Sequence, residues 1–224
     1  MNKFLFPIYA VILGVVIAKL SKNKKTLNTK LLLSFSGAFL LALTLFELLP
    51  EVYDHLDTKL TGLFIMCGIM LQIVLELFSK GAEHGHVHIH KNETAFPWVL
   101  FISLCIHSFL EGFPIHEHND MVYGVLVHKV PIAALISMFL FQSKFTNMQI
   151  VAFLLVFAAM TPLGTYISNT SNISEHFAHA INAVVIGIFF HISTTILFES
   201  GEGHKFNLSK FLSIILGVGV AYLI

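Results

Sequence analysis

The chain has 224 residues, of which 56% are hydrophobic and 12% are charged, and its formal net charge is zero. Because a soluble domain carries about 25% charged residues, this composition excludes an ordinary soluble globular domain and indicates a membrane-embedded chain. The balanced charge gives no support to nucleic-acid binding, so we expect no nucleic-acid partner.

Apolar segments recur along the whole chain at the length of transmembrane helices. A helix of roughly 17–23 residues crosses a bilayer core of about 30 Å. We therefore predict an all-α polytopic membrane protein, a bundle of eight transmembrane helices that forms a single domain over residues 1–224. The predicted spans are 4–20, 31–49, 60–78, 95–113, 122–141, 148–168, 176–198 and 207–224.

The lysines orient this bundle, because cytoplasmic connections of membrane proteins are rich in cationic residues. All 13 cationic residues are lysine, and two of them, Lys3 and Lys59, fall on one side of the predicted bundle. Ten lie on the other side: Lys19, Lys22, Lys24, Lys25, Lys30, Lys80, Lys91, Lys144, Lys205 and Lys210. We therefore expect both termini outside the cytoplasm and a cytoplasmic loop at about 80–94. The expected location of the protein is the plasma membrane.

Ionisable side chains stand inside the fourth and fifth predicted spans. Such a residue near a span centre costs about 2.5–3.5 kcal/mol on insertion scales, and it is usually paired or functional. His107 and Glu111 are spaced i, i+4 and share one helix face, and Ser108 adjoins them. His128 enters the next span at a comparable depth. Since imidazole and carboxylate ligands suit Zn²⁺ and related ions, these residues predict a mid-membrane site for a divalent cation.

A structural ion pair is the other interpretation of the same segment. Lys129 follows His128 directly and would then neutralise Glu111, while His107 would hydrogen-bond to a neighbouring helix. Nothing in the sequence alone excludes this arrangement.

Further candidates lie in the second and seventh predicted spans. Glu47 precedes the end of the second span, and His191 lies in the seventh, where a packing role is as plausible as metal binding. Glu51, Asp54, His55 and Asp57 follow Glu47. They are either a solvated loop or a mouth that attracts metal ions, since clustered negative charge raises the local cation concentration.

The connection between the third and fourth predicted spans is rich in histidine. Its histidines alternate over seven residues, at His84, His86, His88 and His90. Histidine-rich tracts are typical of metal binding, and flexible alternation favours a weak, exchangeable site. A polar linker that happens to contain histidine is the alternative.

The motifs resemble those of the ZIP family of divalent metal transporters. "HSFLEG" (107–112) and "HKVP" (128–131) resemble the family's fourth and fifth spans. "SGAFLLALTLFELLPE" (36–51), "TPLG" (161–164) and "GIFFHISTTILFE" (187–199) are similar to its second, sixth and seventh spans.

The resemblance implies uptake of zinc, and in some members of iron, manganese or cadmium, into the cytoplasm. His107, Glu111 and His128 take the ligand positions of the transport site. Ser108 stands where many members have asparagine, and Glu47 where many have histidine. On this basis the ion is a transported substrate, no cofactor is needed, and the protein is not an enzyme.

Lys129 departs from the family pattern, because members often have a carboxylate at this position. Ile132 and Ala133 follow Pro131, where many members have an acidic residue. These changes remove ligands for a second ion. We interpret Lys129 as a tethered cation that substitutes for the second metal, which leaves a site for one ion.

A membrane-embedded zinc hydrolase of the lipid amidase type is the competing class, with zinc activating a water molecule. The chain contains no HExxH sequence, and eight spans fit a seven-span amidase poorly. A metal sensor without transport is a third interpretation, for which eight spans are more than is needed. The expected partners are divalent metal ions and the lipid bilayer. The sequence leaves open a homodimer, the energy coupling and the physiological metal.

Overall fold

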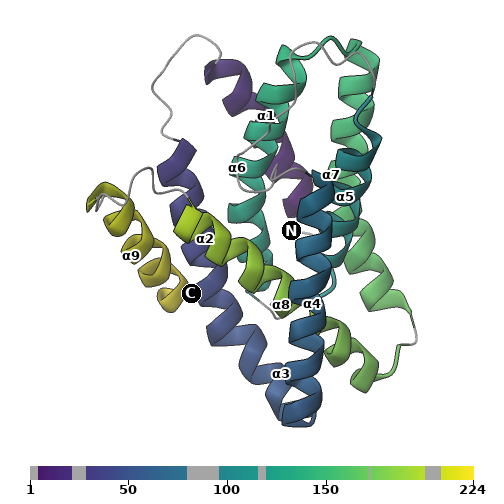
Figure 1. Ribbon diagram of the computed structural model, residues 1–224, viewed down its shortest axis with the longest axis vertical. Helices are drawn as coiled ribbons and strands as arrows, with labels where there is room; N and C mark the ends of the chain where they lie inside the picture. Colours follow the sequence, from purple (N-terminus) through teal and green to yellow (C-terminus); the bar gives the residue numbers. More distant parts are fainter. Residues whose placement is uncertain (1–4, 22–28, 80–95, 116–119, 172, 200–207) are drawn as a thin grey trace.

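The computed structural model describes residues 5–21, 29–79, 96–115, 120–171, 173–199 and 208–224, and these form a helical bundle that contains no β-strand (Figure 1). Five of its helical segments are long and apolar enough to cross a membrane, and three shorter ones are apolar. The elements are α1 (Phe6–Ser21), α2 (Thr29–Leu43), a π-helical turn (Thr44–Leu48), α3 (Leu49–His55), α4 (Thr58–Ser79), α5 (Trp98–Leu110), α6 (Met121–Gln142), α7 (Asn147–Thr170), α8 (Glu175–Glu199) and α9 (Leu208–Leu223). The predicted all-α architecture is confirmed.

The second helical segment is longer than the sequence predicts. It runs from Thr29 to His55, because the π-helical turn joins α2 to α3 without a break. Pro50 explains the turn: proline lacks an N–H group and crowds the preceding carbonyls, and the wider turn relieves this. The amide of Leu49 donates to Thr44 O, five residues back. Consequently Glu51, Asp54 and His55 belong to a helix and not to a loop, whereas Asp57 lies in the exposed connection between α3 and α4, as the loop interpretation expects.

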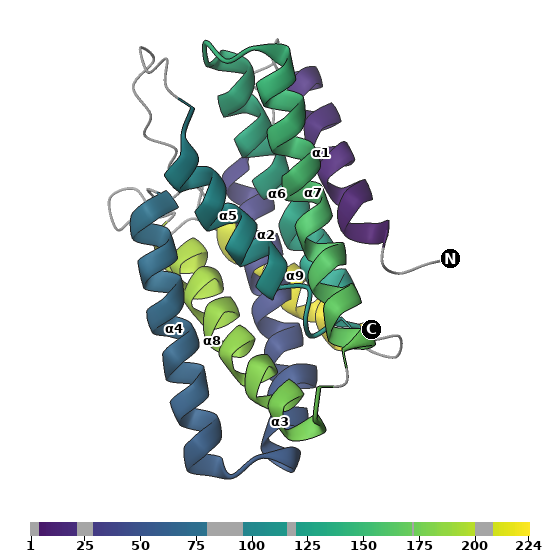
Figure 2. The same cartoon turned by 90° about the vertical axis from the view of Figure 1, so that its right-hand side faces the viewer.

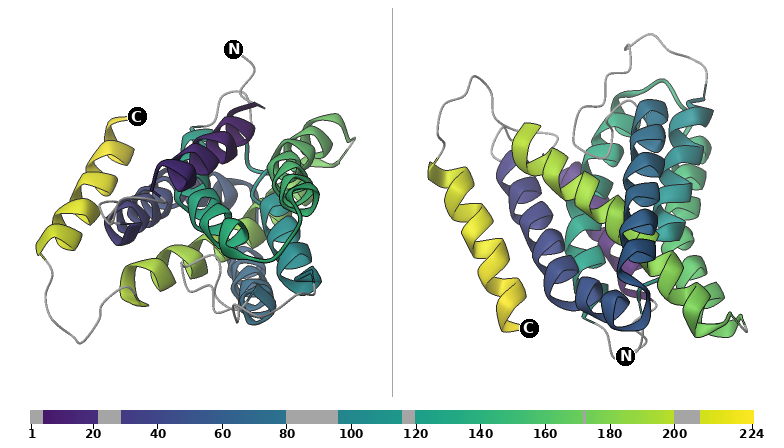
Figure 3. Two further views of the ribbon diagram at one scale, coloured as in Figure 1. Left: turned by 90° about the horizontal axis from the view of Figure 1, so that it is seen from above. Right: turned by 60° about the horizontal axis from the view of Figure 1, so that its bottom comes forward.

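The chain reverses direction between consecutive helical segments. The turn between α6 and α7 lies at the upper end of the bundle in Figure 2, and the turn between α3 and α4 lies at the lower end. The main contacts join α1 to α6, α2 to α9, α4 to α8 and α5 to α7. Helix α9 lies at the periphery, against α2 (Figure 3).

Glycines bring two of these helix pairs into backbone contact. A Cβ atom on Gly68 of α4 would lie 1.9 Å from Val184 O, and one on Gly187 of α8 would lie 2.0 Å from Ile65 O. Such approaches are open only to glycine, because any side chain would overlap the partner backbone. The same relation holds between α5 and α7, where a Cβ atom on Gly164 would lie 2.0 Å from Phe109 O. This second contact fixes the end of α5, which carries the ionisable residues.

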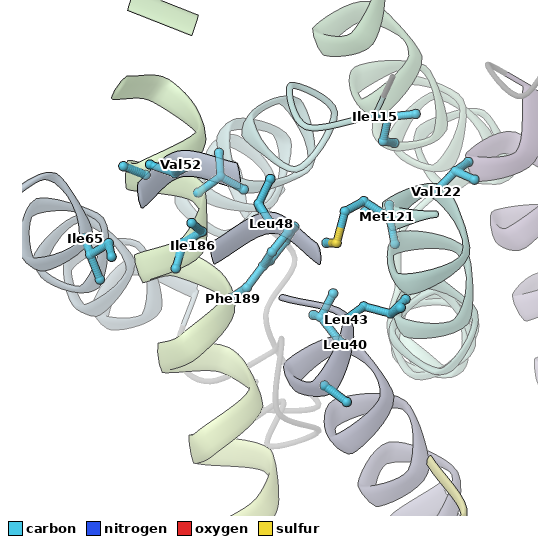
Figure 4. Packing of buried hydrophobic residues seen from close by; sticks show 14 of the residues in the cluster. Leu40, Leu43, Leu48, Val52, Ile65, Ile115, Met121, Val122, Ile186 and Phe189 are labelled. Atoms are coloured by element: carbon cyan, nitrogen blue, oxygen red, sulfur yellow. The ribbon is translucent and has the colours of Figure 1, made fainter. Parts of the chain in front are cut away.

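An apolar cluster fills the bundle between α2, α3, α6 and α8 (Figure 4). Leu48 and Val52 meet Ile186 and Phe189 of α8 there, and Met121 of α6 lies in the same cluster. All five side chains are fully buried. Because dense apolar packing excludes water, this part of the bundle is dry.

Candidate metal site

Four ionisable side chains from α5 and α6 are buried in one place inside the bundle. His107 lies in the last turn of α5, and Glu111 directly follows that helix. His128 and Lys129 lie in the middle of α6. Each of the four residues is at most 3% exposed. Burial of this much charge is costly unless every polar group has a partner, so the contacts of each side chain decide what the site can do.

The Lys129 ammonium group is fully hydrogen-bonded. Its Nζ donates to Ser108 Oγ at 3.0 Å, to Thr161 Oγ1 at 2.8 Å and to Glu111 Oε1. An ammonium has three N–H donors, and these three acceptors use them all. The Phe157 ring lies 4.4 Å from Nζ and adds a cation–π contact. The expected pairing of Lys129 with Glu111 is therefore present.

The two oxygens of the Glu111 carboxylate have different neighbours. Oε1 accepts from Lys129 and lies 2.7 Å from Thr161 Oγ1. Oε2 faces His107 Nε2 at 3.3 Å. Two ligands that each lie about 2.1 Å from a tetrahedral zinc ion are about 3.4 Å apart. The His107–Glu111 pair is at hydrogen-bond distance in this structure, and the same spacing also suits two ligands of one zinc ion.

His128 lies beside this pair. Its ring is roughly perpendicular to the His107 ring, with 6.3 Å between the centroids. Within the described residues, neither ring nitrogen of His128 has a hydrogen-bond partner, although both are buried. Since buried polar atoms are nearly always satisfied, a histidine in this state is suited to a ligand or a water molecule.

Thr161 of α7 completes the site, and the sequence analysis did not single it out as a site residue. The amide of Gly112 donates to Phe109 O and not to Ser108 O, because α5 ends in a tighter turn. Thr161 Oγ1 lies 2.9 Å from the Ser108 carbonyl oxygen that this turn leaves open. The motif "TPLG" held the available signal, a polar residue inside an apolar span, but nothing in it identified the partner.

Thr161 belongs to a row of hydroxyl groups on α7. Thr165 Oγ1 donates to Gly112 O at 2.8 Å, and Ser168 Oγ donates to Phe113 O at 3.1 Å. Spacings of four and three residues place all three hydroxyls on one face of α7. The last carbonyl groups of a helix have no hydrogen-bond partner within the helix, and this row of hydroxyls provides partners at the end of α5. The same hydrogen bonds fix the backbone around Glu111.

The other predicted residues lie elsewhere. Glu47 is exposed on the π-helical turn. His191 of α8 contacts Glu76 of α4, with 3.4 Å between Nε2 and Oε2. The histidine-rich tract lies outside the described residues. Among the described residues, no three His, Cys, Asp or Glu side chains are grouped closely enough to hold a metal ion as they stand.

Comparison with known proteins decides the family. The family model for the ZIP Zinc transporter matches residues 79–224, which include the whole candidate site. This chain is a member of the ZIP zinc transporter family. The resemblance seen in its motifs is therefore confirmed, and so is its assignment to a family of membrane transport proteins.

Two fish proteins illustrate the relationship. The ZIP chain is 31% identical to Zinc transporter ZIP1 of Danio rerio over 135 residues, which cover 57% of this chain and 45% of the relative. It is 28% identical to Zinc transporter ZIP1 of Takifugu rubripes over 150 residues, 62% of this chain and 50% of the relative. The chain thus spans about half the length of the curated relatives it matches.

Proposed function

We propose that this chain is one transport domain that moves a divalent cation, zinc in the first place, across the membrane into the cytoplasm. Membership in the ZIP family and the names of the two fish relatives support zinc as the substrate. The observation that carries the proposal is the His107–Glu111 pair, whose 3.3 Å spacing suits one zinc ion, beside a buried His128. The ion-pair interpretation explains Lys129 but gives His128 no partner.

The proposed site binds one ion through His107, Glu111 Oε2 and His128. Lys129 and Thr161 occupy Oε1 and hold the carboxylate so that Oε2 faces His107. The ligands do not yet surround one point, so binding requires His128 to turn toward the pair. Ser108 supports the site through its contact with Lys129. Lys129 takes the place of a second cation.

Glu47 and His191 lie along the route to and from this site in the same proposal. Glu47, exposed on the π-helical turn, meets arriving ions, and His191 with Glu76 lies near the far side of the bundle. Following the lysine distribution, both termini face outside in the plasma membrane. The loop that carries His84, His86, His88 and His90 is cytoplasmic and binds zinc weakly.

Uptake into proteoliposomes tests the proposal. His107→Ala and Glu111→Ala should each abolish saturable Zn²⁺ uptake. The unfolding temperature of each variant is measured as well, because Glu111→Ala also leaves the Lys129 ammonium without its counter-charge. Competition by Fe²⁺, Mn²⁺ and Cd²⁺ identifies other substrates, and the mass of the protein in nanodiscs tests the homodimer. A lipid amidase assay on the same samples tests the hydrolase, which family membership does not favour. Near-normal uptake by both alanine variants would overturn the proposed site.

A further inference from the structure

A second group of metal-binding side chains lies at the α3–α4 end of the bundle. Glu51 and His55 lie on α3, one turn apart, and His179 lies in the first turns of α8. The rings of His55 and His179 are stacked, with 4.1 Å between centroids and 19° between planes. His179 Nδ1 lies 4.0 Å from Glu51 Oε1. Two helices therefore bring two imidazoles and a carboxylate together.

These three side chains have the chemistry of a cation site. His55 Nδ1 lies 2.8 Å from the Glu51 carbonyl oxygen, which only accepts hydrogen bonds, so Nδ1 carries the proton. In the neutral ring Nε2 is then the nitrogen with a free lone pair, the form that binds metal ions. Histidine fixed through one nitrogen to a backbone carbonyl is a common metal ligand.

The spacing of His179 and Glu51 is within the reach of one ion. His179 Nδ1 and Glu51 Oε1 lie 4.0 Å apart, which is somewhat more than the distance of about 3.4 Å between two ligands of a tetrahedral zinc ion, so a small side-chain rotation is needed to bring both onto one ion. His55 is exposed, so a tilt of its ring toward the ion meets little resistance. The side chains of His179 and Glu51 are partly exposed, which gives an ion access from solvent.

We propose that Glu51, His55 and His179 form a second divalent-cation site, distinct from His107, Glu111 and His128. Two imidazoles favour Zn²⁺, Co²⁺ or Cd²⁺ over Mg²⁺ or Ca²⁺. The two sites share no residue and lie on different helices, α3 and α8 for this site and α5 and α6 for the buried one. The site captures ions before they enter the bundle, and its position outside the cell rests on the orientation proposed above. Binding itself does not depend on transport.

Ion binding by the purified full-length chain tests this site. All variants carry serine in place of His84, His86, His88 and His90, so that the loop contributes nothing. Zn²⁺ stoichiometry comes from equilibrium dialysis, and the visible spectrum of bound Co²⁺ reports imidazole ligands. Replacing a residue that only orients a ligand costs about 10–100-fold in metal affinity, so His55→Gln and His179→Gln should each lose at least as much.

His176→Gln is the matched control, because His176 is an exposed histidine one turn before His179 on α8. It should bind Zn²⁺ like the parent chain. An equal loss of Zn²⁺ affinity in His176→Gln and His179→Gln would indicate a diffuse histidine-rich surface and overturn the proposal. Full Zn²⁺ binding by both His55→Gln and His179→Gln would also overturn it. Thermal unfolding without metal should be the same for all three variants, which excludes misfolding as the cause of a loss.

The second site and the proposed transport site can be tested independently of each other. Glu111→Gln should remove the ion of the buried site and leave the ion at His179 in place. Loss of an ion in His179→Gln but not in Glu111→Gln would support this site and contradict the proposed transport site. Loss of an ion in Glu111→Gln but not in His179→Gln would support the proposed transport site and contradict the second site.

Discussion

The Lys129 ammonium donates a hydrogen bond to Glu111 Oε1, and the hydroxyl of Thr161 lies 2.7 Å from the same oxygen. One oxygen of the carboxylate is therefore occupied by the protein, and the other faces His107. This division of the carboxylate allows Glu111 to be both half of a buried ion pair and a metal ligand.

Lys129→Ala should destabilise the protein, because it leaves the buried Glu111 carboxylate without its counter-charge. Removing one partner of a buried ion pair typically costs about 3–5 kcal/mol. We expect a lower unfolding temperature in detergent and slower Zn²⁺ uptake. An unchanged unfolding temperature would contradict the buried pair.

A double variant separates stability from transport. Lys129→Met with Glu111→Gln replaces both charges by neutral groups of similar size, and such replacements are often neutral or stabilising. The double variant should regain most of the stability lost in Lys129→Ala and still transport no zinc, since the carboxylate ligand is gone. Recovery of uptake together with stability would show that Glu111 has no role beyond the ion pair.

Thr161→Val should lower Zn²⁺ uptake, because valine keeps the shape of threonine but has no hydroxyl group. It can neither accept from Lys129 nor donate a proton to Glu111 Oε1 or to the Ser108 carbonyl oxygen. An unsatisfied buried polar group costs about 1–3 kcal/mol. Thr165→Val is the matched control: Thr165 caps Gly112 O from the same face of α7, and no hydrogen bond joins it to Glu111. We expect similar losses of stability in both variants and a greater loss of uptake in Thr161→Val. Equal uptake would mean that Thr161 only supports the fold.

The sequence predicts several of the long helices closely, because the bilayer thickness fixes their length, whereas Trp98–Leu110 is shorter than its predicted span 95–113. The predicted span 122–141 became α6 (Met121–Gln142), and 176–198 became α8 (Glu175–Glu199). It also predicts that His107 and Glu111 meet, since helix geometry places residues i and i+4 on one face. Contacts within one helix are encoded locally, and for that reason they can be derived without the structure.

Contacts between helices are not encoded in this way. Thr161 meets Ser108 across 53 residues of sequence, and no periodicity indicates that α5 lies against α7. The same holds for His179, because its spatial neighbours Glu51 and His55 belong to a helix that is distant in the sequence. The continuation of α2 to His55 was missed for another reason, because proline is usually a signal for a helix end.

Gly164→Ala should destabilise the bundle by forcing α5 and α7 apart. The added Cβ atom would lie 2.0 Å from the Phe109 carbonyl oxygen, and backbone atoms cannot turn away. Overpacking of this kind costs about 1–3 kcal/mol or more. Gly62→Ala is the control, since a Cβ atom there has nothing within 4 Å and alanine favours a helix. Thermal unfolding should distinguish the two variants, and comparable stability would contradict the close contact.

Replacing His84, His86, His88 and His90 together by serine should change the rate of zinc uptake without abolishing it. The tract lies between predicted spans, so we expect it to bind zinc weakly beside the route and not within it. The measurement is the initial rate of uptake into proteoliposomes as a function of Zn²⁺ concentration. Complete loss of uptake would show that the loop is part of the essential route.

Lys129→Glu should convert the one-ion site into a two-ion site. The ammonium now lies against Glu111, Ser108 and Thr161, which is where a second cation would find oxygen ligands. A glutamate at this position adds a carboxylate beside that of Glu111, and two such groups repel each other unless a cation lies between them. Metal analysis of the purified variant, with serine in place of the four loop histidines, should find one more bound Zn²⁺ per chain than the parent binds. Lys129→Gln is the control, because it removes the ammonium without adding a ligand, and it should gain no ion. If Lys129→Glu binds no more zinc than Lys129→Gln, then Lys129 does not occupy the position of a second metal ion.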